Sequence, residues 1–366
     1  MNYVFFCSRL DTMFEKRKEL LCSLIGRGDR VVLCSMEPHN ETESKLKAIG
    51  VELHIKSCPR NKIDITKDFR YVVRILFLLL RVKPDVLVSY TIKPNLYCGI
   101  ALRFFPRIRF YPVVTGLGYA FQGMSFKRSI LRMGVIFLHR LSFSRATKVI
   151  FQNYENMGLF EEKSISSSPK NIVIEGDGIL LPDSIDKCVN PNRKFVCIAR
   201  LLGGKGLREL NEAAALVRKK HKDFNVEVYG PEETSPDAIT REEILKWNQQ
   251  GGLKWKGYCD NVGEVLKLSD VFVLPSYHEG MSTAVCEAIS HGVPIVGTDI
   301  AGIREMVQGN GILVPVRDAR TLAKALEKML TVSDDEIKKM GRFSRDMAVA
   351  KFDRFAVMKR IEEVIV

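Results

Sequence analysis

The chain alternates between short runs rich in β-branched and aromatic residues and longer segments with helical periodicity. Such alternation predicts parallel sheets covered by helices, because a crossover helix returns the chain to the edge from which the next parallel strand starts. Two cycles are visible. We expect strands at 3–7, 30–35, 51–55, 85–90, 109–115 and 148–152 in the first cycle, and at 194–200, 224–230, 253–257, 271–276, 294–298 and 311–315 in the second.

The chain length also favours two domains, because 366 residues exceed what one hydrophobic core usually organises. We expect a doubly wound α/β domain at 1–175 and a second one at 190–349, joined by a loop at 176–190. A closing helix at 350–366 is expected to pack back on the first domain. Ligands of such sheets bind outside the carboxyl ends of the strands.

Composition excludes several classes of protein. The nine cysteines include no CxxC pair, which argues against a zinc or redox motif and favours a reducing compartment. The N-terminus lacks the pattern of a signal peptide. The apolar runs at 75–80 and 133–138 are too short to span a bilayer. We therefore expect a cytoplasmic protein.

The net charge of +13 is concentrated in one stretch, which has ten lysines and arginines but no acidic residue between Asp85 and Glu155. Such a surface attracts polyanions. Nucleic acid is not expected, because no helix-turn-helix, zinc finger or RRM signature is present. A helix predicted at 125–145 mixes apolar residues with Lys127, Arg128 and Arg132, which favours an anionic membrane surface. An ordinary solvated basic face is the alternative.

A glycine-rich loop follows the first strand of the second cycle, where "CIAR" leads into "LLGGKGLREL". Its glycines allow close approach of the backbone to a ligand, and Arg200 and Lys205 supply positive charge. The spacing is not that of a Walker A motif, and no strand is followed by GxGxxG. The loop is predicted to bind an anion, and we expect a diphosphate; a plain surface turn is also compatible with it.

Two glutamates flank the start of a predicted helix in "HEGMSTAVCEAISHGVPIV". Glu279 precedes the helix, which is expected to begin near Met281 or Ser282, and Glu287 lies within it among apolar neighbours. We interpret one carboxylate as binding ribose hydroxyls and the other as meeting a donor sugar, with a diphosphate near the helix start. An exposed helical glutamate is the alternative for Glu287. The remaining donor-site candidates are His278, Gly280, Met281, Ser282 and Thr283.

With these motifs the sequence resembles the retaining glycosyltransferases of family 4, on "EGMSTAVCE", "RLLGGKG" and "GVPIVGTDIAGIREMV". The resemblance implies the GT-B fold, two Rossmann-like domains that face a central cleft. It further implies that Arg200 and Lys205 bind the donor diphosphate, that Glu279 lies beside the donor sugar and that Glu287 holds the ribose. Tyr258 stands where the family binds the nucleobase.

The first half of the chain has a narrower likeness. "YTIKPNLYCGI", "TGLGYAF" and "VIFQN" resemble bacterial enzymes that extend polyprenyl-diphosphate-linked glycans for O-antigen, capsule or N-glycan assembly, with N-acetylhexosaminyltransferases nearest. An acceptor site is expected after the strands of the first domain, although Lys93-Pro94-Asn95 also suits a plain helix start. The acceptor-site candidates are Thr91, Lys93, Asn95, Thr115, Gly116 and Gly118.

Two departures from the family pattern bear on mechanism. Residues 7–14, "CSRLDTMF", replace the Gly-Gly loop of many members, and Thr115-Gly116 replace a frequent histidine. With no protein base visible, the leaving phosphate is expected to take the acceptor proton, while Arg200, Lys205 and the helix start stabilise the departing diphosphate. We expect no metal and no cofactor.

The sequence thus predicts a retaining glycosyltransferase that is peripheral on the inner face of the bacterial cytoplasmic membrane. It would move an N-acetylhexosamine from a UDP-sugar to a polyprenyl-diphosphate-linked saccharide. Two alternatives stay open: a nucleotide-sugar epimerase of the same fold, and a basic membrane-binding protein without enzymatic activity.

Overall fold

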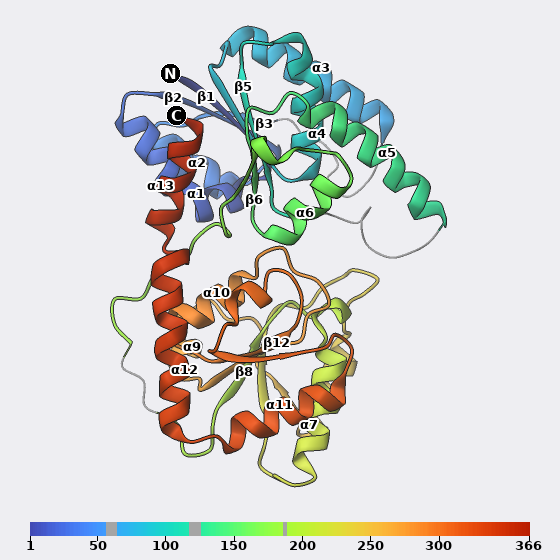
Figure 1. The fold of residues 1–366 in the computed structure, drawn as a ribbon, viewed down its shortest axis with the longest axis vertical. Coiled ribbons are helices and arrows are strands. Elements are labelled where there is room, and N and C mark those ends of the chain that lie inside the picture. The colour runs from blue at the N-terminus through green and yellow to red at the C-terminus, as the bar shows by residue number, and fades with distance from the viewer. Residues whose placement is uncertain (56–63, 117–125, 186–188) are drawn as a thin grey trace. The chain divides into compact units, whose positions relative to one another are not determined.

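The computed structural model describes residues 1–55, 64–116, 126–185 and 189–366, with the side chains of all of these except residue 65 and residues 126–132. Contacts divide the chain into two units (Figure 1). The first comprises 1–178 and 355–366, and the second comprises 179–354. The chain therefore passes from one unit to the other after Gly178 and again after Arg354.

The first unit has a seven-stranded parallel sheet in the order β3-β2-β1-β4-β5-β6-β7. The strands extend outward in both directions from β1 and β4, which is the doubly wound arrangement. The strands are β1 (Asn2–Arg9), β2 (Arg30–Glu37), β3 (Glu52–Ile55), β4 (Val86–Tyr90), β5 (Arg109–Val114), β6 (Val149–Phe151) and β7 (Asn171–Val173).

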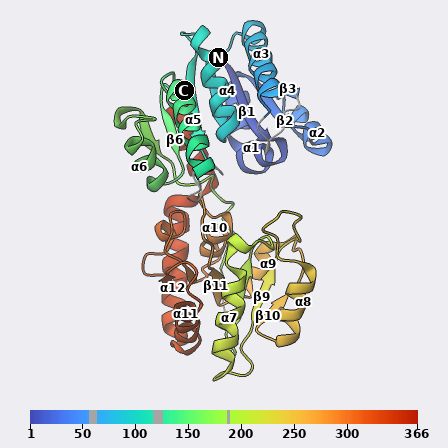
Figure 2. The ribbon, with the colours of Figure 1, turned by 90° about the vertical axis from the view of Figure 1, so that its right-hand side faces the viewer.

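Alternate side chains of the central strand β1 enter two separate cores, one on each face of the sheet. Tyr3 and Phe5 pack on one face and Val4 and Phe6 on the other, as a parallel sheet buried on both sides requires. The first face is covered by α1 (Leu10–Gly26), α2 (Asn40–Ala48) and α13 (Arg354–Ile365). The second face is covered by α3 (Ile65–Val82), α4 (Ile92–Ala101), α5 (Phe126–Phe143) and α6 (Tyr154–Glu162), and Figure 2 shows α4 between α3 and α5.

The second unit has a six-stranded parallel sheet in the order β10-β9-β8-β11-β12-β13. Its strands are β8 (Phe195–Ile198), β9 (Val226–Tyr229), β10 (Leu253–Trp255), β11 (Val271–Leu274), β12 (Ile295–Thr298) and β13 (Gly311–Val314). Helices α7 (Leu207–Arg218) and α11 (Ala319–Thr331) pack side by side, and α9 (Val262–Lys267), α10 (Thr283–Ser290) and α12 (Asp334–Met347) lie on the other side of the sheet (Figures 1 and 2). Helix α8 (Arg241–Gln250) packs beside β10.

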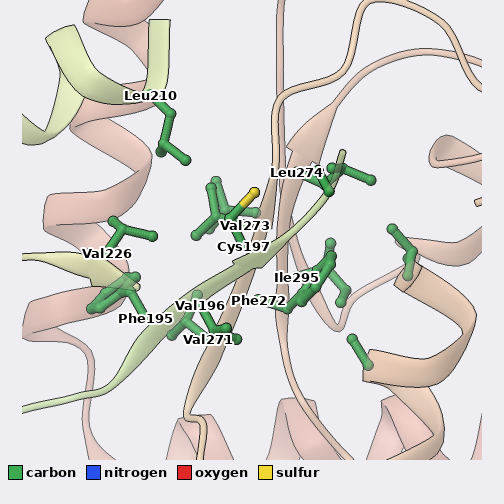
Figure 3. Close-up of a cluster of buried hydrophobic side chains, with 14 of the residues drawn as sticks. Phe195, Val196, Cys197, Leu210, Val226, Val271, Phe272, Val273, Leu274 and Ile295 are labelled. Carbon is green, nitrogen blue, oxygen red and sulfur yellow. The ribbon is translucent and has the colours of Figure 1, made fainter. Parts of the chain in front are cut away.

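The core of the second unit is built from the two central strands and the helices over them. Figure 3 shows Phe195 and Cys197 of β8 with Val273 of β11, and Leu210 of α7 among them. All four side chains are almost completely buried. This rigid centre fixes the carboxyl ends of β8 and β11, from which the loops of the candidate site depart.

The predicted pair of doubly wound parallel sheets is confirmed. All twelve predicted strands are present with ends shifted by a few residues, and β7 is an additional strand that the sequence analysis did not predict. It has only three half-buried residues at the edge of the sheet, so it leaves no clear periodic signal. The closing segment contains α12, a π-helical turn at Ala348–Phe352 and α13. Within the described residues, no helix is long and apolar enough to cross a bilayer.

Candidate active site

The candidate site lies where the connections of the second sheet reverse direction. From β8 the chain moves outward through β9 to β10, and from β11 it moves the other way through β12 to β13. Strands β8 and β11 are hydrogen-bonded neighbours, with Phe195 aligned to Val271. The loops after these two strands therefore leave in opposite directions, and a doubly wound sheet binds its ligands at such a switch point.

Lys205 and Glu279 meet at this point, one from each loop. Lys205 Nζ lies 2.6 Å from Glu279 Oε1, and Ser276 Oγ donates to the same oxygen at 2.8 Å. The two charged side chains are 20% and 12% exposed, so water screens the pair less than it screens an open surface pair. Among the described residues Glu279 Oε2 accepts no hydrogen bond, which leaves this oxygen for a ligand.

Backbone and side-chain contacts tie the two loops together. Tyr277 N–H donates to Gly204 O at 2.9 Å, and Thr298 Oγ1 donates to Ser276 O. The Tyr277 hydroxyl donates to Glu209 Oε1 of α7 at 2.6 Å. Burial, followed by this bond to the carboxylate, raises the pKa of Tyr277 to about 12. The phenol therefore stays a neutral donor that holds the Glu279 loop against α7.

The backbone N–H groups of the glycine-rich loop are hydrogen-bonded within the protein. Gly203 N–H donates to the backbone oxygen of Asp237 and Gly204 N–H to its carboxylate, both at 2.7 Å. The N–H groups of Lys205 and Gly206 are also bonded within the loop. These N–H donors are already engaged, so the loop presents its cations through side chains, and close approach of its backbone to an anion stays a prediction.

Packing inside the protein explains the glycine at position 206. Gly206 has φ 69°, and a Cβ atom there would lie 2.0 Å from Pro275 O. Only glycine therefore lets the loop after β8 lie against the loop after β11. At Gly204 a Cβ atom would have only an ordinary contact, 3.4 Å from Asp237 Oδ2.

Arg200 and Lys205 have different partners. The Arg200 side chain is 60% exposed, and its Nη1 pairs with Glu233 Oε1 at 3.2 Å. The structure thus brings Lys205 to Glu279, whereas Arg200 is held by a carboxylate on the loop after β9. Sequence analysis did not identify Glu233, because no local pattern marks a surface residue 33 positions away.

The helix that carries Glu287 begins slightly later than predicted. Ser282 is the N-cap of α10, with its Oγ accepting from Val285 N–H at 3.4 Å. Its own N–H donates to Gly302 O at 3.2 Å, so this predicted ligand donor is engaged. Glu287 is half-buried, in the second turn of α10. Met281 packs against the core of the second unit, while His278, Thr283 and Tyr258 are exposed.

Thr91 occupies the corresponding switch point of the first unit. It follows β4, and its Oγ1 lies 2.5 Å from Oγ of Ser8, near the end of β1. Its φ is 75°, a conformation that β-branched residues rarely adopt and that is often found at functional sites. Lys93 is two residues further on, with Nζ 3.1 Å from Asp68 Oδ1.

Asn95 has a structural role here, which corrects its interpretation as an acceptor contact. It is buried, its Oδ1 accepts from Ser89 Oγ at 2.6 Å, and its Nδ2 donates to Val113 O at 3.0 Å. Thr115 and Gly116 are half-buried after β5. Gly118 and the side chains of Lys127, Arg128 and Arg132 lie outside the described residues, and the backbone of these three basic residues is in α5.

Besides Glu233, sequence analysis also missed Ser276, Tyr277 and Asp237. Ser276 had a usable signal, because it ends the apolar run at 271–276 and so stands at a strand's carboxyl end. Asp237 had none, since it reaches the glycine loop from a connection after β9. No group of three or more His, Cys, Asp or Glu side chains is arranged to hold a metal ion in the described part of the chain.

Comparison with known proteins finds a family of transferases that is similar to the unit carrying this site. Residues 192–332 match the family model described as "Glycosyl transferases group 1". The chain is 26% identical over 339 residues, 87% of its own length and 86% of the relative's, to an N,N'-diacetylbacillosaminyl-diphospho-undecaprenol alpha-1,3-N-acetylgalactosaminyltransferase from Campylobacter jejuni. It is 26% identical over 323 residues, 82% of this chain and 79% of the relative, to a UDP-Gal:alpha-D-GlcNAc-diphosphoundecaprenol alpha-1,3-galactosyltransferase from Escherichia coli.

A solved structure extends the likeness to the whole chain. A glycosyltransferase from Rickettsia africae superposes with a TM-score of 0.76 at 16% identity, covering 100% of this chain and 97% of that one. This likeness establishes the fold, while the family model and the two curated relatives identify the enzyme class. The chain is a glycosyltransferase of the GT-B fold, and residues 192–332 of its second unit are similar to the group 1 glycosyltransferases.

Proposed function

We propose that this glycosyltransferase moves a sugar, an N-acetylhexosamine, from a UDP-sugar to a polyprenyl-diphosphate-linked saccharide, with retention of anomeric configuration. The names of the two relatives support this class of acceptor, since both names include an undecaprenol diphosphate that carries a sugar. One of these names also includes UDP-Gal as the donor of that relative. An N-acetylhexosamine is favoured over galactose by the likeness of the first half of the chain to N-acetylhexosaminyltransferases.

The observation that carries the proposal is the contact between Lys205 and Glu279 at the switch point of the second sheet. A donor diphosphate at this point meets a lysine that is already desolvated and positioned. Glu279 keeps that lysine in place until the donor binds, and its second oxygen is left for a hydroxyl of the donor sugar. Arg200, on the exposed side of the loop, is long enough to leave Glu233 for a phosphate.

In the proposed reaction, the bond between the anomeric carbon and the diphosphate oxygen breaks, and an acceptor hydroxyl oxygen bonds to the same carbon on the same face. The acceptor proton passes to the departing diphosphate. Negative charge therefore grows on the diphosphate in the transition state, where Lys205 and Arg200 stabilise it. Two cations at the leaving group support a reaction without a metal ion.

For the acceptor, we propose a site at the end of β4, with Thr91 and Lys93 contacting it. The strained backbone of Thr91 supports this assignment, because such strain is usually retained where it serves binding. We place the enzyme on the inner face of the bacterial cytoplasmic membrane, held there by α5 with Lys127, Arg128 and Arg132. A nucleotide-sugar epimerase and a non-enzymatic protein are both disfavoured by the family and relatives of this chain.

The test is a panel of nucleotide sugars incubated with purified protein and a polyprenyl-diphosphate N-acetylhexosamine. We expect UDP release that depends on the acceptor, is fastest with a UDP-N-acetylhexosamine, and is unchanged by EDTA. NMR of the product is expected to show an α-anomer from an α-linked donor. Acceptor-independent conversion of the donor into an isomer would instead support an epimerase and refute the transfer reaction.

A further inference from the structure

Helix α3 of the first unit has two apolar faces on opposite sides. One face enters the core through Tyr71, Ile75, Leu79 and Val82, each at most 3% exposed. The opposite face carries Phe69, Val73, Phe77 and Leu80, which recur at helical spacing on one side. Phe69 and Phe77 are each 68% exposed and Leu80 is 57% exposed. A helix that only covers a sheet needs a polar outer face, so this second apolar stripe calls for a partner.

A row of arginines runs beside this exposed stripe. Arg70, Arg74 and Arg81 are spaced four and seven residues apart and are all exposed. Among the described residues, none of the three forms an ion pair with a carboxylate. Asp68 is the one acidic residue in α3, and it pairs with Lys93. The outer surface of the helix thus combines bulky apolar side chains with three arginine side chains.

The same layer of helices continues this character beyond α3. Phe104, which follows α4, is 73% exposed, and Met133 and Phe137 of α5 are 70% and 65% exposed. Arg103 and Arg140 are exposed in the same two segments. Figure 2 shows α3, α4 and α5 on one side of the first sheet, and contacts join α4 to both of its neighbours. The exposed apolar residues therefore belong to one covering layer of the first unit.

A cavity of about 250 Å³ opens under α3. Phe6, Cys34 and His54 line it in one row across β1, β2 and β3, where they are aligned in register. On the helix side it is lined by Tyr71, Arg74, Ile75, Phe77, Leu78 and Arg81. Two arginines of the exposed row thus border an apolar space, which is an environment for a hydrocarbon chain that ends in an anionic group.

The chemistry of this surface selects among its possible partners. A second copy of the chain would bring the same arginine row against itself in a twofold interface, and like charges there repel. An anionic bilayer complements both features, because apolar side chains enter the boundary between headgroups and acyl chains while arginines bind phosphate. An interfacial helix needs this combination of side chains and no membrane-spanning length.

We propose that α3 is a membrane-binding element, which inserts Phe69, Phe77 and Leu80 into an anionic leaflet and binds lipid phosphates through Arg70, Arg74 and Arg81. This inference rests on the proposed function in placing the enzyme at a membrane, and it adds a second helix to the contact that the proposed function assigns to α5. The first unit then binds the leaflet through one face, which contains α3, the residues after α4, and α5.

The test is co-sedimentation with vesicles of phosphatidylglycerol and phosphatidylcholine, compared with vesicles of phosphatidylcholine alone. The two variants are Phe77→Ser/Leu80→Ser and Arg74→Gln/Arg81→Gln, each checked for native circular dichroism. Matched controls are Phe343→Ser and Lys338→Gln/Lys339→Gln, exposed residues of α12 in the second unit. The arginine variant is expected to bind anionic vesicles about 30-fold more weakly, since each cation near such a surface contributes about fivefold. We expect at least a tenfold loss for the apolar variant and no change for the controls.

Two further measurements separate the possible outcomes. Sugar transfer to a short-chain, water-soluble acceptor should be unchanged in both variants, because α3 belongs to the first unit and the donor-site residues belong to the second. If the wild type binds vesicles through α3 yet transfers no sugar, the proposed function fails and the inference stands. Equal vesicle binding by the wild type and both variants overturns the inference. The inference is also overturned if the variants lose self-association, measured by light scattering, and keep their vesicle binding.

Discussion

Lys205 Nζ lies 2.6 Å from Glu279 Oε1, an oxygen that also accepts a hydrogen bond from Ser276. The two residues come from loops after neighbouring strands, 74 positions apart in the chain. A lysine held in this way is positioned before the donor arrives, so little reorganisation is needed when charge develops on the leaving diphosphate. The contact is therefore a structural link between two loops, and in the proposed reaction it also positions Lys205 for transition-state stabilisation.

Replacement of Lys205 by methionine should lower kcat by about 100- to 1000-fold, because one electrostatic contact to the developing charge is lost. Steady-state UDP release measures the effect. The double variant with Glu279→Gln should lose less than the product of the two single losses, since each single change leaves a partner without its ion pair. Wild-type turnover in Lys205→Met would contradict the assigned role.

The two glycines of the loop should respond differently to alanine. Gly206→Ala places a Cβ atom against Pro275 O in a conformation with positive φ, and should destabilise the second unit by about 2–4 kcal/mol. Gly204→Ala adds a side chain with only an ordinary contact and should keep near-native stability. Urea unfolding and UDP titration of both variants check this. A stable Gly204→Ala that no longer binds UDP would show that ligand approach, and not packing, requires that glycine.

Glu287→Ala should weaken UDP binding by about 10- to 100-fold, since ribose hydroxyls that lose a charged acceptor cost about 1.5–3 kcal/mol. The change should appear in KM for the donor more than in kcat, because ribose contacts are alike in the ground and transition states. Isothermal titration with UDP measures it. Glu264→Ala, at an exposed position of the neighbouring helix α9, is the matched control. Equal UDP affinity in the two variants would exclude the ribose role.

Protonation of His139 should make the first unit less stable in acid. Burial lowers the pKa of this side chain from 6.5 to about 4, in contact with the rings of Phe143 and Phe160. The unfolded chain binds the proton at a higher pH than the folded one, so stability is complete above about pH 6.5 and falls as the pH drops toward 4. Between about pH 7 and pH 5 the free energy of unfolding should fall by about 2 kcal/mol from this residue. Urea unfolding of His139→Phe at pH 7 and pH 5 measures this effect. The variant should lack the part of the decrease in unfolding free energy that comes from His139.

Much of the fold could be predicted from the sequence because both sheets are parallel and buried on two faces. Runs such as 3–7 and 271–274 are apolar throughout, and each is separated from the next by a helical segment. The short edge strand β7 could not be predicted, since Asn171–Val173 is half-buried and has no alternation. The observed helix boundaries differ from the predicted ones where a side chain sets the end of the helix, as at Ser282, whose hydroxyl caps α10.

Within the site, the sequence predicted only those residues whose positions follow from the ends of the strands. Lys205 and Glu279 follow strands that a doubly wound order makes neighbours, and this places them together. Two carboxylates from the connection after β9 meet the glycine-rich loop: Glu233 pairs with Arg200, and Asp237 accepts from Gly204 N–H. Their positions depend on the path of this one surface connection. Such a path depends on tertiary packing and leaves no local pattern. The sequence therefore marked the glycines, but the packing of Gly206 against Pro275 could not be predicted from it.

Helix α13 completes the core of the first unit with Val357, Met358, Ile361 and Ile365, although the whole second unit precedes it in the chain. During translation, the ribosome makes these residues only after residues 179–354 have emerged. The apolar surface that α13 covers on β1 and α1 must then stay open until this late stage of synthesis. The second unit is free to fold first, and a nascent chain that stalls before residue 355 carries an unsealed core that chaperones and proteases recognise.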